Sequence, residues 1–241
     1  DNSYVGAEWV LTRQLASNDF DADANSDILW RNGSTGGTLV WEMNGGTAKA
    51  KLNAGRVSTA WQVAGAGDFD GDHKADILWH NASTGQVMIW EMDGGTVRAK
   101  LAAGRLDTAW QIAGTGDFDA DGRSDIHWYN KSTGGVLLWE MIGGTVKAKV
   151  NIGKAAKGWQ IAATADFDGD GTTDILWHNK STGSVSLWAM NAGTGTVKVK
   201  SNAGQAASSW RIVGAADFDG DGKADILWFN ASTRIVAIWE M

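Results

Sequence analysis

The sequence of 241 residues contains neither cysteine nor proline. The missing cysteines exclude disulfide scaffolds, zinc fingers, iron–sulfur sites and thiol nucleophiles. Average usage would place roughly a dozen prolines in a chain of this length, so the turns must depend on Gly, Asn, Asp, Ser and Thr instead. No run approaches the ~18 consecutive apolar residues of a membrane-spanning helix, and none is predicted. The chain begins with Asp-Asn-Ser, which is neither an initiator methionine nor a signal peptide, and we expect a soluble chain, mature or excised.

Aspartate and tryptophan, by contrast, recur with a fixed period. The sequence has 15 Trp and 32 Gly, and 43% of its residues are hydrophobic, which is enough for a core. Each of five copies contains three tryptophans, and the copies are spaced by 49, 49, 49 and 51 residues. Their common segment, Asp-Phe-Asp-x-Asp, starts at Asp19, Asp68, Asp117, Asp166 and Asp217.

Each copy reads as four short strands separated by turn residues, without an apolar pattern of helical period. In the second copy the strands are expected at 61–65, 77–80, 86–92 and 96–101. The fourth strand alternates apolar and basic residues, which is typical of the outer edge of a sheet. Repeated four-stranded antiparallel units predict an all-β fold, a β-propeller of five four-stranded blades with about 49 residues per repeat. A linear solenoid is the main alternative.

We expect residues 1–241 to form a single five-bladed propeller. The predicted repeats are 9–60, 61–109, 110–158, 159–209 and 210–241. The last copy stops at the end of its third strand, and closure of the propeller is therefore open. Residues 1–8 could complete the last blade, that blade could be short, or the chain could be part of a larger propeller. The incomplete last blade is also a candidate for self-association.

The acidic loops carry the strongest chemical signal. In the fourth copy Asp166, Asp168, Asp170 and Asp174 occupy loop positions 1, 3, 5 and 9, with Gly171 at position 6. Four carboxylates within nine residues repel one another unless a cation neutralises them. Clustered hard oxygen ligands favour Ca²⁺, with the backbone carbonyl of position 7 as a further ligand. The alternative is a set of Asx turns without metal.

These loops resemble the FG-GAP/VCBS repeats, whose members include the propellers of integrin alpha chains and many secreted bacterial proteins. The resemblance covers all five copies and is closest in residues 166–177 and 217–228, which read Asp-Phe-Asp-Gly-Asp-Gly-x-x-Asp-Ile-Leu-Trp. It implies about five structural Ca²⁺ ions, each bound between the first and second strands of a blade. The implied ligands are Asp19, Asp21, Asp23, Asn25 and Asp27; Asp68, Asp70, Asp72, Lys74 and Asp76; Asp117, Asp119, Asp121, Arg123 and Asp125; Asp166, Asp168, Asp170, Thr172 and Asp174; and Asp217, Asp219, Asp221, Lys223 and Asp225.

Two copies depart from the pattern at position 6, where Ala24 and His73 replace glycine. A residue with a side chain costs about 1 kcal/mol or more at a positive φ. The first two sites are therefore expected to be weaker than the others.

Strand direction places a ligand-binding surface on the rim opposite the calcium loops. In an up-and-down blade, that rim holds the hairpins between strands two and three and the connections to the next blade. An indole beside polar groups can hold a sugar ring, although most of the tryptophans are expected to pack between blades. The candidate ligand-binding residues are Trp61, Trp110, Trp159 and Trp210, which open the first strands, together with Arg56, Arg105, His80 and His178.

The hairpins also contain Asn-x-Ser/Thr sequences, for which an Asx-capped turn is favoured over glycosylation. No asymmetric constellation of catalytic residues breaks the repeat, and an enzyme is not expected. Nucleic-acid binding is not expected either, because the basic residues are spread over sheet edges. The sequence predicts a secreted, calcium-stabilised binding module, most simply a multivalent lectin. The alternative is a protein-binding adhesion or scaffold domain, or an accessory domain of a larger secreted protein.

Overall fold

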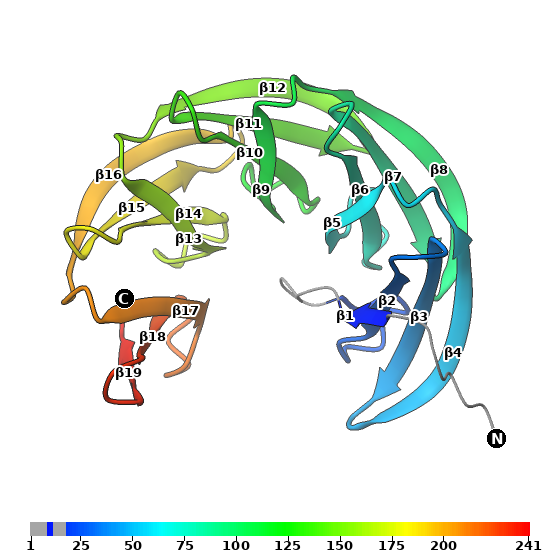
Figure 1. Ribbon diagram of the computed structural model, residues 1–241, viewed down its shortest axis with the longest axis horizontal. Coiled ribbons are helices and arrows are strands. Elements are labelled where there is room, and N and C mark those ends of the chain that lie inside the picture. Colours follow the sequence, from blue (N-terminus) through cyan, green and yellow to red (C-terminus); the bar gives the residue numbers. More distant parts are fainter. Residues whose placement is uncertain (1–8, 12–17) are drawn as a thin grey trace. The chain divides into compact units, whose positions relative to one another are not determined.

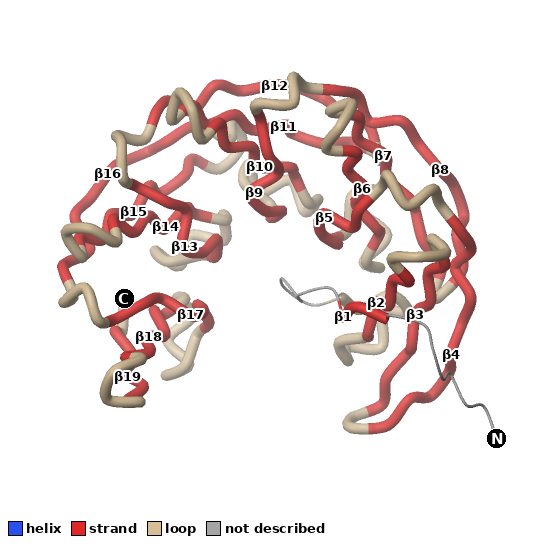
Figure 2. The backbone as a smooth tube through the Cα atoms, in the orientation of Figure 1, coloured by secondary structure: helices blue, strands red, loops and turns tan. Residues whose placement is uncertain are grey.

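The computed structural model describes residues 9–11 and 18–241 (Figures 1 and 2). This part of the chain forms nineteen β-strands and no helix, so it offers no helix that could cross a membrane. The strands form five antiparallel sheets, the blades, each within one predicted repeat. The prediction of an all-β propeller built from repeats of about 49 residues is confirmed. Closure into a single five-bladed domain stays a prediction, and residues 1–8 lie outside the described residues.

The chain divides into two compact units, residues 1–115 with 141–147 and residues 116–140 with 148–241. The first unit contains two whole blades. The first blade is ordered β1-β2-β3-β4 and the second β5-β6-β7-β8. Their strands are β1 (Trp9–Leu11), β2 (Ile28–Asn32), β3 (Gly37–Asn44) and β4 (Thr47–Arg56), then β5 (Gln62–Gly67), β6 (Asp76–Asn81), β7 (Gln86–Asp93) and β8 (Thr96–Arg105).

The second unit contains the fourth and fifth blades, ordered β13-β14-β15-β16 and β17-β18-β19. Their strands are β13 (Trp159–Ala165), β14 (Asp174–Asn179), β15 (Ser184–Asn191) and β16 (Thr196–Gln205), then β17 (Trp210–Ala216), β18 (Asp225–Asn230) and β19 (Ile235–Trp239). The third blade has residues in both units. Its strands are β9 (Trp110–Gly116), β10 (Asp125–Asn130), β11 (Gly135–Ile142) and β12 (Thr145–Lys154).

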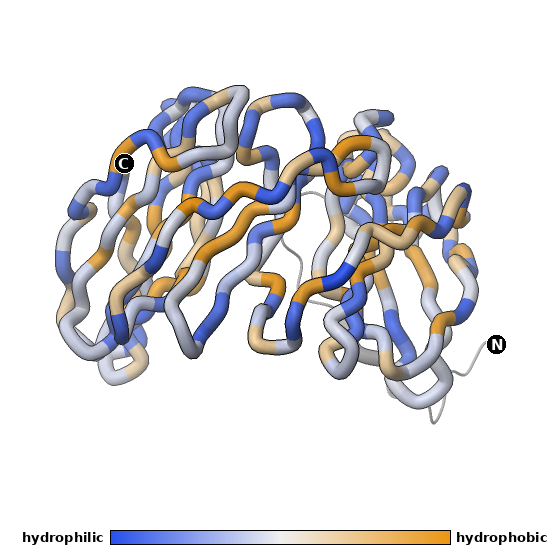
Figure 3. The backbone as a smooth tube through the Cα atoms, turned by 90° about the horizontal axis from the view of Figure 1, so that it is seen from above, coloured by the Kyte–Doolittle hydropathy of each residue, from blue (hydrophilic) through white to orange (hydrophobic). Residues whose placement is uncertain are grey.

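Burial follows the position of a strand in its blade. The second strand is the most deeply buried, and five of the six residues of β6 are buried. The fourth strand is the outermost, and along β8 exposed and half-buried residues alternate up to Leu101. Hydrophilic and apolar stretches alternate along the chain in Figure 3. The basic residues of the predicted edge strands therefore lie where the sequence pattern placed them.

A pair of tryptophans packs together in every blade. One indole comes from the second strand and one from the third, with ring centroids 4.7 to 5.0 Å apart. In the first four blades a lysine ammonium lies 3.4 to 4.2 Å from the centre of the second indole ring. The pairs are Trp30–Trp41, Trp79–Trp90, Trp128–Trp139, Trp177–Trp188 and Trp228–Trp239, and the lysines are Lys51, Lys100, Lys149 and Lys200.

Backbone hydrogen bonds show which loops share an edge. In each of the first four blades, the residue that directly follows the fourth strand donates to the hairpin glycine, as Ala206 N does to Gly183 O at 2.9 Å. On the other edge, the third-to-fourth turn of one blade donates to the acidic loop of the preceding one, as Gly193 N does to Asp119 O at 2.5 Å. The sequence-based assignment of these elements to two opposite edges is therefore correct.

Candidate metal centres and tryptophan pockets

Position 9 of each acidic loop is a buried aspartate at or directly before the start of the second strand. In the second blade, Asp76 Oδ2 accepts a hydrogen bond from Phe69 N at 3.0 Å, and its Oδ1 accepts one from Met92 N at 2.8 Å. Equivalent bonds hold Asp27, Asp174 and Asp225. This carboxylate thus ties the loop to the third strand and fixes the position of its own oxygens.

Position 1 shapes the rest of the loop. In the fourth blade Asp166 Oδ1 accepts from Gly169 N at 2.7 Å and Oδ2 from Gly171 N at 2.8 Å. Both donor residues have positive φ, 78° and 84°. The loop therefore needs two residues in the left-handed conformation, at positions 4 and 6. The sequence pattern predicts only the one at position 6.

The carboxylates of positions 1, 3 and 9 converge in every loop. Each offers one oxygen, and these oxygens lie within 4.8 Å of one another in five groups: Asp19, Asp21 and Asp27; Asp68, Asp70 and Asp76; Asp117, Asp119 and Asp125; Asp166, Asp168 and Asp174; and Asp217, Asp219 and Asp225. Three convergent carboxylates suit a hard divalent cation such as Ca²⁺.

Two further observations fit a cation at these centres. Asp21 Oδ1 and Asp168 Oδ1 are buried and have no hydrogen-bond partner among the described residues. Burial raises the pKa of Asp76 to about 7 and that of Asp174 to about 6, because their ionised forms lose solvation. A bound divalent ion would supply the missing partner and stabilise the ionised carboxylates.

Positions 5 and 7 differ from the other predicted ligands. The carboxylate at position 5 is outside the converging groups, and its Oδ1 accepts a hydrogen bond from the backbone N–H of position 7. The bonded pairs are Asp23 with Asn25, Asp72 with Lys74, Asp121 with Arg123, Asp170 with Thr172 and Asp221 with Lys223. The side chains of Lys74 and Arg123 form ion pairs with Asp93 and Asp121, so only their carbonyls remain suited to a cation.

Basic residues of the fourth strands reach the acidic loops. Lys198 Nζ lies 3.0 Å from both Asp168 Oδ2 and Asp170 Oδ2. Lys49 pairs with Asp21 and Asp23, and Arg98 with Asp70 and Asp72, in the same manner. The alternating sequence pattern predicts only edge protection for these residues. Lys49 and Arg98 lie 28 residues after the position-3 aspartate that they contact, whereas Lys198 lies 30 residues after Asp168, so no fixed offset marks these contacts in the sequence.

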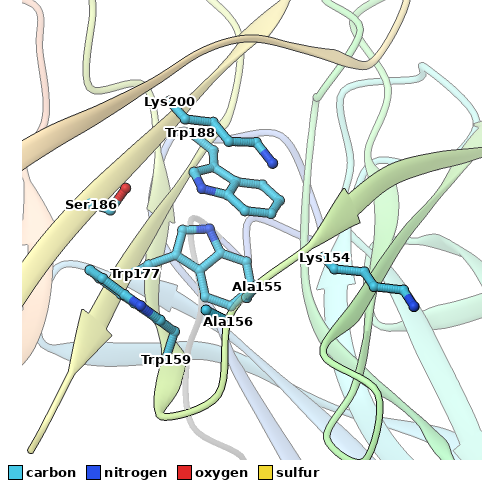
Figure 4. Close-up of a pocket in the computed structure, with 8 residues that line it drawn as sticks. All are labelled: Lys154, Ala155, Ala156, Trp159, Trp177, Ser186, Trp188 and Lys200. Carbon is cyan, nitrogen blue, oxygen red and sulfur yellow. The ribbon is translucent and has the colours of Figure 1, made fainter.

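The second candidate site is a set of tryptophan pockets. They lie at the edge of the blades that holds the second-to-third hairpins and the connections to the next blade. Trp61, Trp110, Trp159 and Trp210 are partly exposed there, whereas the second-strand partners Trp79, Trp128, Trp177 and Trp228 are buried. In the fourth blade a cavity of about 230 Å³ is lined by Lys154, Ala155, Ala156, Trp159, Trp177, Ser186, Trp188 and Lys200 (Figure 4). In the fifth, a cavity of about 200 Å³ is lined by Ala206, Ala207, Trp210, Trp228, Ala237 and Trp239.

The other candidate ligand-binding residues have different surroundings. Arg56 and Arg105 are exposed at the ends of β4 and β8, and His80 is half-buried. His178 is 4% exposed, and its ring makes an edge-on contact with Trp228 of the next blade at 5.4 Å. Its expected role at a binding surface is therefore corrected to packing between blades.

The residue before the hairpin has this packing role in other blades too. The guanidinium of Arg31 lies over Trp79 and donates to Trp61 O at 2.9 Å, and Tyr129 Oη donates to Trp159 O at 3.2 Å. Each of these side chains thus anchors the tryptophan that opens the following blade.

A family model described as FG-GAP-like repeat matches residues 19–79, 68–128, 117–177 and 166–228. The chain belongs to the FG-GAP-like repeat family. Among curated proteins, none matches the chain. Solved propellers resemble this FG-GAP-like repeat protein in fold, at low identity. A chain of the nidogen/laminin complex is 16% identical with a TM-score of 0.58, over 89% of this chain and 73% of that one. Regucalcin of Agrobacterium tumefaciens, described as a calcium-binding protein, is 11% identical with a TM-score of 0.55, over 96% and 76%.

Proposed function

We propose that this protein is a secreted, non-catalytic binding module that is stabilised by calcium and binds carbohydrate. The observation that carries the proposal is the group of three indoles at the hairpin-and-connection edge, which in the fourth and fifth blades surrounds a cavity. An indole face contacts the C–H face of a sugar, and nearby polar groups bond its hydroxyls. Several weak sites on one chain gain avidity for a glycan-covered surface.

Calcium has a structural role in this proposal. The converging carboxylates are tied to backbone N–H groups of their own blade, and the loops of successive blades are joined by bonds such as Ala224 N to Asp166 O at 2.7 Å. A cation there would fix the first strand to the second and one loop to the next. Millimolar extracellular Ca²⁺ saturates even modest sites, which suits a secreted protein without disulfides.

Binding without catalysis is supported by the repetition itself. Catalysis requires one asymmetric arrangement of acid, base or nucleophile. The clusters of three carboxylates found in the described residues recur in all five blades, and all of them belong to the metal loops. Two glutamates of the Trp-Glu-Met segments have structural partners: Glu42 Oε1 accepts from Gly95 N at 3.2 Å, and Glu91 pairs with Arg98.

A glycan array tests the carbohydrate proposal. The protein is applied in millimolar Ca²⁺, after chelation, and after Ca²⁺ is restored. We expect binding to a restricted group of glycans in Ca²⁺, its loss on chelation and its recovery. Failure to bind any glycan in Ca²⁺, by protein whose circular dichroism shows it to be folded, would contradict the proposal.

A second candidate function is protein binding, and one observation favours it. In β19 the apolar side chains of Ile235, Val236 and Ile238 are 53%, 59% and 45% exposed. Such a patch on the last strand of a sheet suits a protein partner or a second copy of this chain. Sedimentation over a concentration range tests self-association, with Val236→Lys as the variant expected to abolish it.

A further inference from the structure

The three indoles recur in each repeat, but the two side chains between them change along the chain. This inference rests on the carbohydrate-binding function proposed above and concerns which repeats carry it. The first variable position directly follows the fourth strand of the preceding blade, and the second lies in the third strand, two residues before its tryptophan. The first position holds Val57, Leu106, Ala155 and Ala206, and the second holds Met88, Leu137, Ser186 and Ala237.

In the second blade these two positions hold larger side chains. Val57, Met88 and Trp61 are partly buried, and each packs against the core cluster that contains Trp79 and Trp90. The second blade therefore has a valine and a methionine where the fourth has an alanine and a serine, and methionine adapts well to irregular gaps.

In the fourth blade both positions are small, and the space is open. Ala155 and Ser186 replace the valine and the methionine, and the cavity of about 230 Å³ lies among Trp159, Trp177 and Trp188. Figure 4 shows the rings of Trp177 and Trp188 one above the other, with Ala155 and Ala156 beside Trp177. The fifth blade has Ala206 and Ala237 at these positions and a cavity of about 200 Å³.

The size and lining of the cavities restrict the ligand. Pockets for drug-sized ligands measure about 300–1,000 Å³, so each cavity suits one sugar ring rather than an enclosed oligosaccharide. The lining is mostly indole rings and alanine methyl groups. In the fourth blade Ser186 Oγ donates to Ser201 O at 2.9 Å, which leaves its lone pairs to accept from a sugar hydroxyl, and Lys154 and Lys200 add donors at the margin.

We infer that the sugar sites are the cavities of the fourth and fifth blades, and that the second blade has none because Val57 and Met88 fill it. Each site takes a single terminal sugar that turns an apolar group, a methyl or a C–H face, towards the indoles. Two sites on neighbouring blades make the chain bivalent rather than five-valent.

Calorimetric titration with two matched pairs of sugars tests the ligand class. L-Fucose differs from L-galactose only in lacking the hydroxyl at C6, and N-acetyl-D-glucosamine carries an acetamido group, with its methyl, where D-glucose has a hydroxyl. We expect at least one methyl-bearing sugar to bind with two sites per chain and at least fivefold more tightly than its partner. Equal affinities within both pairs would overturn the assignment of an apolar contact.

Filling the cavities with the side chains of the second blade tests their location. Ala155→Val with Ser186→Met should remove one site, Ala206→Val with Ala237→Met the other, and all four substitutions should weaken binding at least tenfold. The second blade already accommodates a valine and a methionine at these positions, packed against the cluster that contains Trp79 and Trp90, and thermal unfolding checks that the variants fold. The matched control, Val57→Ala with Met88→Ser, should keep both sites and open a third.

The outcomes separate the two proposals. If the parent protein binds none of the sugars on the array or in the calorimeter, the carbohydrate-binding function itself is wrong. If the parent binds sugar and the fourfold variant binds it equally well, the function stands and the assignment to these two cavities is wrong.

Discussion

At the scale of single residues, the acidic loops differ in the strain they contain. Positions 4 and 6 have positive φ in every loop, and glycine occupies both in the fourth and fifth loops. The first loop instead has Ala22 at 59° and Ala24 at 66°, the second has His73 at 67° and the third has Ala120 at 58°. A side chain at such a φ costs roughly 1–2 kcal/mol. The first loop therefore has the most strained backbone of the five.

Replacing the two strained alanines by glycine should stabilise the first blade. We expect Ala22→Gly and Ala24→Gly each to raise the free energy of unfolding by about 1 kcal/mol, because glycine adopts positive φ freely. Urea unfolding in excess Ca²⁺ measures the effect. Ala75→Gly is the matched control, since Ala75 is buried and has no positive φ, and it should destabilise the protein. A loss of stability in both loop variants would contradict the argument.

His127 is a second residue that departs from the repeat. It is fully buried at a position where the other blades have Leu29, Leu78, Leu176 and Leu227, and its ring meets Phe118 edge-on at 5.6 Å. Neither ring nitrogen has a hydrogen-bond partner among the described residues. Burial lowers its pKa to about 3, because the charged ring would lose its solvation.

This histidine should make the protein sensitive to acid. Between its ordinary pKa of 6.5 and about 3, the unfolded chain binds a proton that the folded chain does not, so stability falls as the pH falls through this window. We expect His127→Leu to gain up to ~1.4 kcal/mol over the parent per pH unit below 6.5. Urea titrations from pH 7.5 to 5, in excess Ca²⁺, measure the difference. Leu176→His should introduce the same pH dependence, and a pH-independent difference would count against the assignment.

At the scale of structural elements, the junction of hairpin and connection determines how one blade leads to the next. The hairpin ends in a glycine of positive φ, namely Gly36, Gly85, Gly134 or Gly183, whose carbonyl accepts from the connection. A Cβ on Gly183 would lie 1.7 Å from Ala206 O. The fifth hairpin has Arg234 at this position, with φ of 61°.

Substitutions at these two positions should have opposite effects. We expect Gly183→Ala to destabilise the protein by about 2 kcal/mol or more, because the methyl group meets a backbone carbonyl that cannot move without breaking the junction. Arg234→Gly should stabilise it by about 1 kcal/mol, since it relieves the strained φ. Thermal unfolding of the pair provides the comparison. Equal shifts of the same sign would show that the junction does not control stability.

Much of each element follows from the sequence because the determining residues are local. The Asp-rich loops, the turn glycines and the alternating outer strands all act within a few residues, and five copies make them visible. The contact of Lys198 with Asp168 spans 30 residues and depends on the register between β15 and β16. That register shifts at Val185/Ser186 and again at Ala189/Met190. No residue type marks such irregularities, so sequence reasoning missed the cations at the loops.

Packing between blades likewise depends on residues far apart in the sequence, so local patterns do not predict it. The rings of Tyr129 and His178 each contact a tryptophan of the next blade, Trp177 and Trp228, and the sequence alone does not show which residues meet across two blades. The open cavities likewise depend on pairs such as Ala155 and Ser186, which lie 31 residues apart and meet only in the folded blade. Local sequence patterns therefore reveal the repeat, whereas the roles of the residues that differ between copies can be seen only in the tertiary structure.

At the scale of the whole molecule, the charge balance depends on the metal loops. The formal charge of the chain is −7, and 20 of its 28 acidic residues are loop aspartates. Five divalent ions, each adding two charges, would bring the formal charge to +3. The metal-free chain thus has a strongly acidic set of loops, with carboxylates such as Asp76 buried at a cost in free energy. Removing the ions should affect every blade at once.

Chelation should therefore lower the thermal unfolding midpoint by many degrees. Each site that binds only the folded state adds about 2.7 kcal/mol when the ion is at a hundredfold excess over Kd. Five such sites add an amount comparable to the whole stability of a typical domain, ~5–15 kcal/mol. Calorimetry with chelator, then with restored Ca²⁺, measures the shift, and an unchanged midpoint would rule out structural metal.

The number of ions bound provides the site-specific control for this prediction. Asp168→Asn removes a carboxylate whose buried Oδ1 has no hydrogen-bond partner among the described residues, and calcium titration should then count one ion fewer per chain. Asp170→Asn alters the exposed position 5 of the same loop, which lies outside the converging group, and should leave the number unchanged. If both variants bind as many ions as the parent, the cations lie elsewhere. If both lose one, position 5 is also a ligand, and the loop must close around the ion more tightly than the converging carboxylates alone require.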